Sequence, residues 1–98
     1  MKRVELHPLA REELADATGR YETRRALFIE RILSILERLH QERVVSGPVP
    51  GVADARGVRR IVVAGFPYSV VFVERSQRRI VLAFAHHRRR PGYWKPRG

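Results

Sequence analysis

The chain has 98 residues, of which 44% are hydrophobic, so it can bury one core, and we expect a single domain over residues 1–98. It has no cysteine, which excludes disulfides and cysteine-ligated metals and fits a reducing compartment such as the cytoplasm. Its net charge of +10 favours an anionic partner.

No segment of the sequence is predicted to span a membrane. The longest apolar run, residues 61–73, is interrupted by Gly65 and Pro67 and is too short to cross a bilayer. The first residues, MKRVELHP, lack the apolar core of a signal peptide. We therefore expect a cytoplasmic protein that contacts no membrane, and we expect neither a cofactor nor a metal.

The positive charge belongs to the second half of the chain. Residues 1–49 carry nine Lys/Arg and eight Asp/Glu, whereas residues 50–98 carry eleven and two. A GC-rich genome explains why arginine outnumbers lysine 18 to 2, but it does not explain why only Asp54 and Glu74 remain as acids after Glu42. We expect the second half to meet nucleic acid or an acidic protein.

The first half predicts a short strand and a helix. Val4 and Leu6 alternate with charged residues, which is typical of a strand. Pro8 suits the first turn of a helix. The predicted helix has an apolar stripe of Ala10, Leu14, Ala17 and Tyr21 and a solvent side of Arg11, Glu12, Glu13 and Asp16. The break falls at residues 21–23, where Thr23 can cap the next helix.

A second helix follows that break. Its predicted apolar face consists of Ile29, Ile32, Leu33, Leu36, Leu39 and His40. Neither helix can bury its apolar face alone, so the hairpin that they form must pack on a sheet.

Three strand-like segments follow a proline- and glycine-rich connection over residues 46–55. They are VRRIVVAG from Val58, YSVVFVER from Tyr68 and RIVLAFAH from Arg79, and the interruptions at residues 66–67 and 76–77 are short enough for hairpins. The predicted fold class is α+β, in the order β-α-α-β-β-β, with the helical hairpin packed on a small, mainly antiparallel sheet.

Strand alternation assigns faces to these segments. It places Ile80, Leu82, Phe84 and His86 on one face of the last strand and Val81, Ala83, Ala85 and His87 on the other. In the segment from Val58, Arg60 lies among apolar residues and must find a partner there. Both faces are too apolar for an open sheet, so we expect a cover other than solvent, of which a bound partner chain is one form.

The chain ends in AHHRRRPGYWKPRG from Ala85. Together with HP-x-A-x-x-E-L at residues 7–14, VRR at 58–60 and FPY at 66–68, this ending closely resembles the RelE/ParE superfamily of type II toxins. The resemblance extends over nearly the whole chain, to Arg97. It implies a cognate acidic antitoxin whose C-terminal segment neutralises the toxin, and hence a hetero-oligomer.

One branch of that superfamily cleaves mRNA on the ribosome. A 2′-hydroxyl then attacks its neighbouring phosphate, which requires a base, an acid and groups that stabilise the charged phosphorane. For this branch the candidate catalytic residues are His86, His87 and Tyr93, and Arg60 and Arg89 are candidates for binding the phosphate.

The other branch binds DNA gyrase and has no turnover of its own. The only lysines, Lys2 and Lys95, lie near the termini, and Glu74 lies at the far end of its strand from His86, so the usual catalytic sets of the ribonuclease branch are not matched. The resemblance therefore favours the ParE-like side. The residues expected to bind the target or a phosphate are Arg59, Arg60, Arg89, Arg90, Trp94 and Arg97.

Structural roles compete with these functional ones. Tyr93 and Trp94 are predicted to fold back over the sheet as a hydrophobic clasp, because large aromatic residues usually stabilise by burial. His86 and His87 can be ordinary polar residues at a sheet end, and Arg88 to Arg90 can be a solvated run. A third function remains open from the residues alone, that of a basic RNA-binding protein without toxic action.

Overall fold

The order of elements is the predicted one. The computed structural model describes residues 1–51 and 57–98, so the predicted connection over residues 46–55 is described only as far as Gly51. The elements are β1 (Arg3–Leu6), α1 (Pro8–Gly19), α2 (Arg25–Leu39), β2 (Val58–Val62), β3 (Tyr68–Arg75), β4 (Arg78–His86) and a final 3-10 turn, η1 (Lys95–Arg97). None of the helices in these residues is long and apolar enough to span a bilayer.

Local chemistry explains where the helices begin. Pro8 opens α1, and the Nδ1 atom of His7 accepts a hydrogen bond from the Leu9 amide, which satisfies one of the free donors of the first turn. The residue that caps α2 is Arg24 and not Thr23, so that prediction was wrong. The Arg24 side chain instead donates to the Gly65 carbonyl and lies over the Phe66 ring, tying the start of α2 to the β2–β3 turn.

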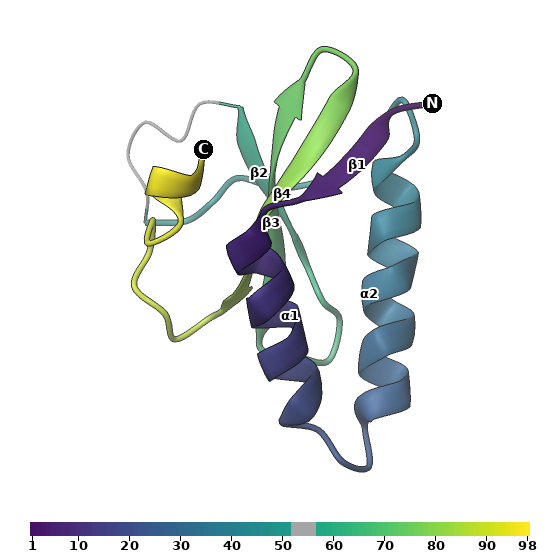
Figure 1. The fold of residues 1–98 in the computed structure, drawn as a ribbon, viewed down its shortest axis with the longest axis vertical. Coiled ribbons are helices and arrows are strands. Elements are labelled where there is room, and N and C mark those ends of the chain that lie inside the picture. Colours follow the sequence, from purple (N-terminus) through teal and green to yellow (C-terminus); the bar gives the residue numbers. More distant parts are fainter. Residues whose placement is uncertain (52–56) are drawn as a thin grey trace.

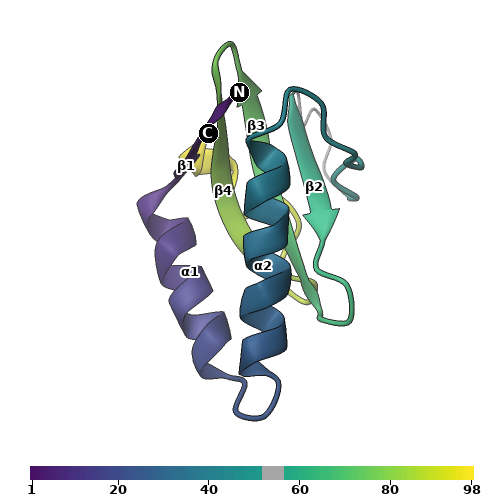
Figure 2. The same ribbon diagram turned by 90° about the vertical axis from the view of Figure 1, so that its right-hand side faces the viewer.

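The sheet has the order β1-β4-β3-β2, and both helices cover one face of it, as Figures 1 and 2 show. β2, β3 and β4 form the predicted antiparallel meander. β1 completes the sheet by pairing with β4 in parallel, with Val4 opposite Arg79. The fold is therefore an α+β fold with a mixed, mainly antiparallel sheet.

The face that α2 buries is rotated from the predicted one. Phe28, Ile32, Ile35 and Leu39 point into the core, whereas Ile29 is 38% exposed and Leu33 is 55% exposed. The spacing of apolar residues on α2 is wide enough to support two adjacent stripes, and the sheet selects the one that carries Phe28. The second stripe remains on the surface.

A β-bulge changes the predicted faces of β4. Val71 pairs with Ala83 and Phe72 with Val81, so one extra residue, Leu82, stands between the two pairs. The assignment of Ile80 and Leu82 to the face of Phe84 was therefore wrong: both belong with Ala83 to the opposite cluster, while Val81 joins Phe84 beneath the helices. Alternation cannot reveal a bulge, because a single inserted residue reverses every face on one side of it.

The chain itself covers the second apolar face. Trp94 is only 3% exposed and packs with Val71, Val73, Leu82 and Ala83, with Val49 and Tyr93 at the margin of the cluster. In Figure 2 the C-terminal segment lies behind the sheet, on the side away from the helices. The predicted clasp is thus present, and no partner chain is needed to cover this part of the sheet.

Candidate functional site

The C-terminal segment is held to α1 by one carboxylate. Glu13 accepts hydrogen bonds from the Tyr93 hydroxyl at 2.7 Å, from Arg97 Nη1 at 2.7 Å and from the Phe84 amide at 3.2 Å. Arg97 also donates to the Leu82 carbonyl at 2.9 Å. We call Glu13, Tyr93 and Arg97 the tail latch. The prediction that Glu13 lies on the solvent side of α1 was wrong, because the tail returns across that side.

Tyr93 joins the latch to the arginine run. The Arg89 guanidinium stacks on its ring at 3.9 Å from the centroid, and that of Arg97 lies at 5.1 Å. Burial, and then the hydrogen bond to Glu13, raise the pKa of the Tyr93 hydroxyl well above its usual value of 10. The phenol therefore stays protonated at neutral pH and donates its hydrogen bond to Glu13.

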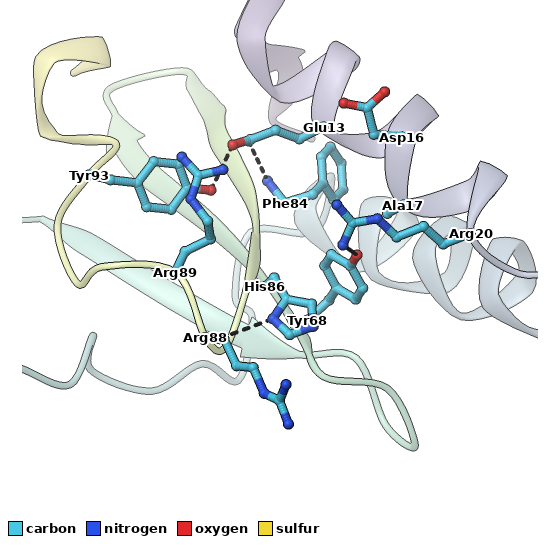
Figure 3. Close-up of a pocket in the computed structure, with 10 residues that line it drawn as sticks. All are labelled: Glu13, Asp16, Ala17, Arg20, Tyr68, Phe84, His86, Arg88, Arg89 and Tyr93. Atoms are coloured by element: carbon cyan, nitrogen blue, oxygen red, sulfur yellow. Dashed lines mark hydrogen bonds between the residues drawn. The ribbon is translucent and has the colours of Figure 1, made fainter.

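Two hollows flank the end of β4. The helix-side pocket, of about 370 Å³, lies between α1 and the tail. It is lined by Glu13, Asp16 and Ala17 of α1 and by Arg20, Tyr68, Phe84, His86, Arg88, Arg89 and Tyr93. Figure 3 shows that the Arg88 side chain points away from it, whereas Arg20 reaches in and donates to the Tyr68 hydroxyl at 3.2 Å.

The tail-side pocket, of about 340 Å³, opens on the opposite face of the sheet. Arg60, Ser69, Val71 and Ala85 form its floor and one wall, Val49 and Pro50 border it, and residues of the 86–94 segment complete it. Its polar centre is a chain of three side chains: Arg60 Nη1 donates to Ser69 Oγ at 3.4 Å, and Ser69 Oγ lies 2.8 Å from His87 Nε2.

The environment of His87 disfavours its charged form. Burial, and after it the positive charges of Arg60 and His86, lower the pKa of His87 below its usual 6.5, while a hydrogen bond to the Tyr68 backbone acts in the opposite direction. His87 is therefore neutral at pH 7, and its neutral ring forms a hydrogen bond with the Ser69 hydroxyl.

The two histidines lie on different sides of the sheet. His86 packs edge-on against Tyr68, with ring centroids 5.0 Å apart, and its Nδ1 accepts from the Arg88 amide at 3.0 Å. His87 bonds to Ser69, whose side chain points away from the helices. Of the candidate catalytic set, His87 borders the tail-side pocket alone, whereas His86 and Tyr93 border both pockets.

Of the six residues predicted to bind the target or a phosphate, four border the tail-side pocket together: Arg60, Arg89, Arg90 and Trp94. Arg59 and Arg97 lie outside it. Arg59 lies on the outer edge of β2, where it donates to Ser46 Oγ and to the Ser46 carbonyl. Arg97 belongs to the tail latch, and the buried Trp94 side chain forms part of the wall of the tail-side pocket.

Among the described residues, the buried arginine is Arg79 and not Arg60. Arg79 is 2% exposed and satisfies its guanidinium with Glu74 and with the carbonyls of Leu39, Gln41 and Glu42. Burial raises the pKa of Glu74, but hydrogen bonds from Arg79 and Lys2 outweigh it and leave that pKa lowered. Arg79 thus anchors the end of α2, while half-buried Arg60 keeps donors for a ligand.

Sequence reasoning missed three residues of this region. Glu13 was assigned to solvent, and Ser69 and Arg20 were not singled out. The only available signal for Ser69 was a small hydroxyl residue inside an apolar strand, which must find a hydrogen-bonding partner when buried. In residues 1–51 and 57–98 no group of three acidic or histidine side chains is arranged to hold a metal ion.

A helical hairpin on this sheet, with a basic surface formed at the end of β4 and its latched tail, has the architecture of the RelE/ParE superfamily of type II toxins. Comparison with curated proteins finds no significant match. Residues 4–91 match the family model described as the ParE toxin of the type II toxin–antitoxin system, parDE. The chain belongs to that family, so it is the toxin of such a system and has an antitoxin partner.

Proposed function

We propose that this toxin arrests growth by binding DNA gyrase stoichiometrically and that a cognate acidic antitoxin neutralises it. One observation carries the choice of a binding mechanism: the side chains that could serve as acid and base are not directed at a common point. His86 faces Tyr68 beside the helices, and His87 faces Ser69 on the other side of the sheet. Each ring is held by different contacts, which argues against their acting together as acid and base on one phosphodiester.

The remaining candidate acid is also engaged. The Tyr93 hydroxyl donates to Glu13, and its raised pKa makes proton release to a leaving oxygen unfavourable. Glu74 is no substitute, since it pairs with Arg79 at the hairpin end of β3, whereas His86 lies opposite Tyr68 at the other end. These contacts support a toxin that acts by occupancy.

The antitoxin has a suitable surface elsewhere. Ile29 and Leu33 leave an exposed apolar stripe on α2, and the chain as a whole is strongly basic. An amphipathic antitoxin segment with acidic residues beside its apolar face fits both features. In this proposal, the α2 stripe is where the antitoxin gains much of its apolar contact.

A second candidate function is ribosome-dependent cleavage of mRNA. One observation favours it: His87 is neutral at pH 7 and lies next to Arg60, so a general base and a phosphate-binding cation share the tail-side pocket. His86 and Tyr93 also border this pocket, but His86 Nδ1 is engaged by the Arg88 amide and the Tyr93 hydroxyl donates to Glu13. Family membership, by contrast, leaves the non-toxic RNA-binding function without support.

The test uses purified toxin in two reactions. In a supercoiling reaction with DNA gyrase, we expect loss of supercoiling and accumulation of cleaved DNA at toxin concentrations comparable to those of the enzyme. In a translating extract, we expect intact mRNA. Cuts in translated messages with normal gyrase activity would refute the proposal and establish the second candidate.

Two variants connect the activity to the site. Arg60→Ala and a truncation before Pro91 are both expected to reduce gyrase inhibition, because each removes part of the tail-side pocket. Arg11→Ala, on the exposed side of α1, is the matched arginine control and is expected to inhibit like the wild type.

A further inference from the structure

The tail-side pocket combines an apolar interior with a cationic rim, and this combination restricts its ligand. Val71, Ala85 and Trp94 form the apolar part. Arg60 and Arg90 line the polar part of the pocket. The Arg90 side chain makes no hydrogen bond or ion pair with any residue that the structure describes. A ligand that fills the hollow must therefore present an apolar group next to negative charge.

Aromatic stacking is not available to such a ligand. Trp94 is 3% exposed, so its ring faces have no room for a base. The Tyr93 ring is already stacked by Arg89 and approached by Arg97. Single-stranded nucleic acids depend on free aromatic faces for much of their affinity. The pocket therefore suits an aliphatic or aromatic side chain of a protein better than a nucleobase.

We propose that the tail-side pocket receives one large apolar side chain from an acidic segment of the toxin's target protein. This inference rests on the proposed function, in which the target is a protein. The hollow of about 340 Å³ has room for a single side chain, and the neighbouring Arg60 and Arg90 pair with acidic residues on either side of it. In the proposed function the antitoxin binds the separate stripe on α2, which leaves the pocket available for the target.

Short peptides test this recognition directly. The probes are three fluorescein-labelled heptapeptides, DEDFDED, DEDGDED and KRKFKRK, and a labelled ten-residue oligothymidylate, all measured by fluorescence anisotropy. We expect DEDFDED to bind about tenfold more tightly than DEDGDED, since it alone buries a phenylalanine. Because Trp94 is the only tryptophan, a change in its emission on adding unlabelled DEDFDED would locate the peptide at the pocket.

Variants then connect the peptide to the pocket. Ala85→Leu places extra methyl groups in the hollow and is expected to weaken DEDFDED binding about tenfold, whereas Ala15→Leu on the exposed side of α1 leaves it unchanged. Should Ala85→Leu fail to fold by circular dichroism, Arg90→Glu provides the same test on an exposed position. It should weaken DEDFDED and strengthen KRKFKRK, and Arg11→Glu should do neither.

The outcomes separate this inference from the proposed function. Equal binding of DEDGDED, or tighter binding of the oligothymidylate, would overturn the apolar anchor. Gyrase inhibition that survives in Ala85→Leu would overturn the inference and leave the proposed function intact. Loss of antitoxin binding in Ala85→Leu with gyrase inhibition retained would assign the pocket to the antitoxin. Specific DEDFDED binding by a toxin that does not inhibit gyrase would support the pocket and refute the choice of target.

Discussion

Glu13 and Arg97 form an ion pair with an N–O distance of 2.7 Å across 84 residues of sequence, and their side chains are only 15% and 11% exposed. The pair joins the second turn of α1 to the last residues of the chain, with the Tyr93 hydroxyl bonded to the same carboxylate. Because both pockets are bordered by the 86–94 segment, their shape depends on this contact.

Glu13→Gln should therefore loosen the tail without unfolding the protein. The amide keeps a single acceptor oxygen, which can serve the Phe84 amide or the Tyr93 hydroxyl but not both, and it loses the charge that Arg97 requires; a hydrogen bond to a charged group contributes about 1.5–3 kcal/mol. We expect trypsin to cut after Arg88 and Arg89 about tenfold faster, as local opening becomes more frequent. Gyrase inhibition should fall in parallel.

Glu12→Gln is the control for that experiment. Glu12 is exposed and makes no hydrogen bond or ion pair within residues 1–51 and 57–98, so its loss should not change the rate of cleavage. Equal protection of the tail in Glu13→Gln and in the wild type would contradict the latch.

Arg79→Leu should lower the free energy of unfolding by about 3 kcal/mol or more. The substitution leaves Glu74 without its main partner and removes the donors that serve three carbonyls at the end of α2. Chemical denaturation monitored by circular dichroism measures the loss. The neighbouring Arg78→Leu breaks only the exposed pair with Glu5 and should change stability by about 0–1 kcal/mol. Similar losses in both variants would show that burial of Arg79 contributes little.

The contrast between Arg60 and Arg79 illustrates how far the sequence predicts this site. Both arginines stand in apolar strands, so the pattern shows that an arginine needs a partner and does not show which one is buried. The order of elements and the β3–β4 hairpin were predictable, because they depend on alternation and on short turns. The bulge at Leu82 and the return of the tail to Glu13 were not, since both depend on contacts between residues far apart in the sequence.

Tyr93→Phe distinguishes a structural phenol from a catalytic one. It removes the hydrogen bond to Glu13 and keeps the ring on which Arg89 stacks. We expect a loss of stability of about 1–2 kcal/mol and nearly unchanged gyrase inhibition at a temperature where the variant is folded. Tyr21→Phe, whose hydroxyl has no hydrogen-bond partner in the described parts of the chain, is the control. Complete loss of toxicity in a folded, stable Tyr93→Phe protein would indicate that the phenol acts in chemistry.

His87 should make the folded protein less stable in mild acid. Burial and the cations Arg60 and His86 depress its pKa in the folded state, so below about pH 6.5 the unfolded chain binds a proton that the folded chain does not. The contribution of neutral His87 to stability is therefore fully present above pH 6.5 and is lost as the pH falls toward the lower pKa of the folded state. His87→Gln should lose less stability than the wild type between pH 7.5 and 5.5.

An internal comparison tests the cause of that pH dependence. Arg60→Gln removes the larger of the two cationic influences on His87, so the pKa of His87 in that variant should rise toward 6.5. Titration of the His87 ring by nuclear magnetic resonance measures the pKa in each protein, and thermal unfolding at each pH measures its effect on stability. Parallel stability profiles for the wild type and His87→Gln from pH 7.5 to 5.5 would mean that the surroundings of His87 do not hold it neutral. The ribonuclease alternative would then lose its general base.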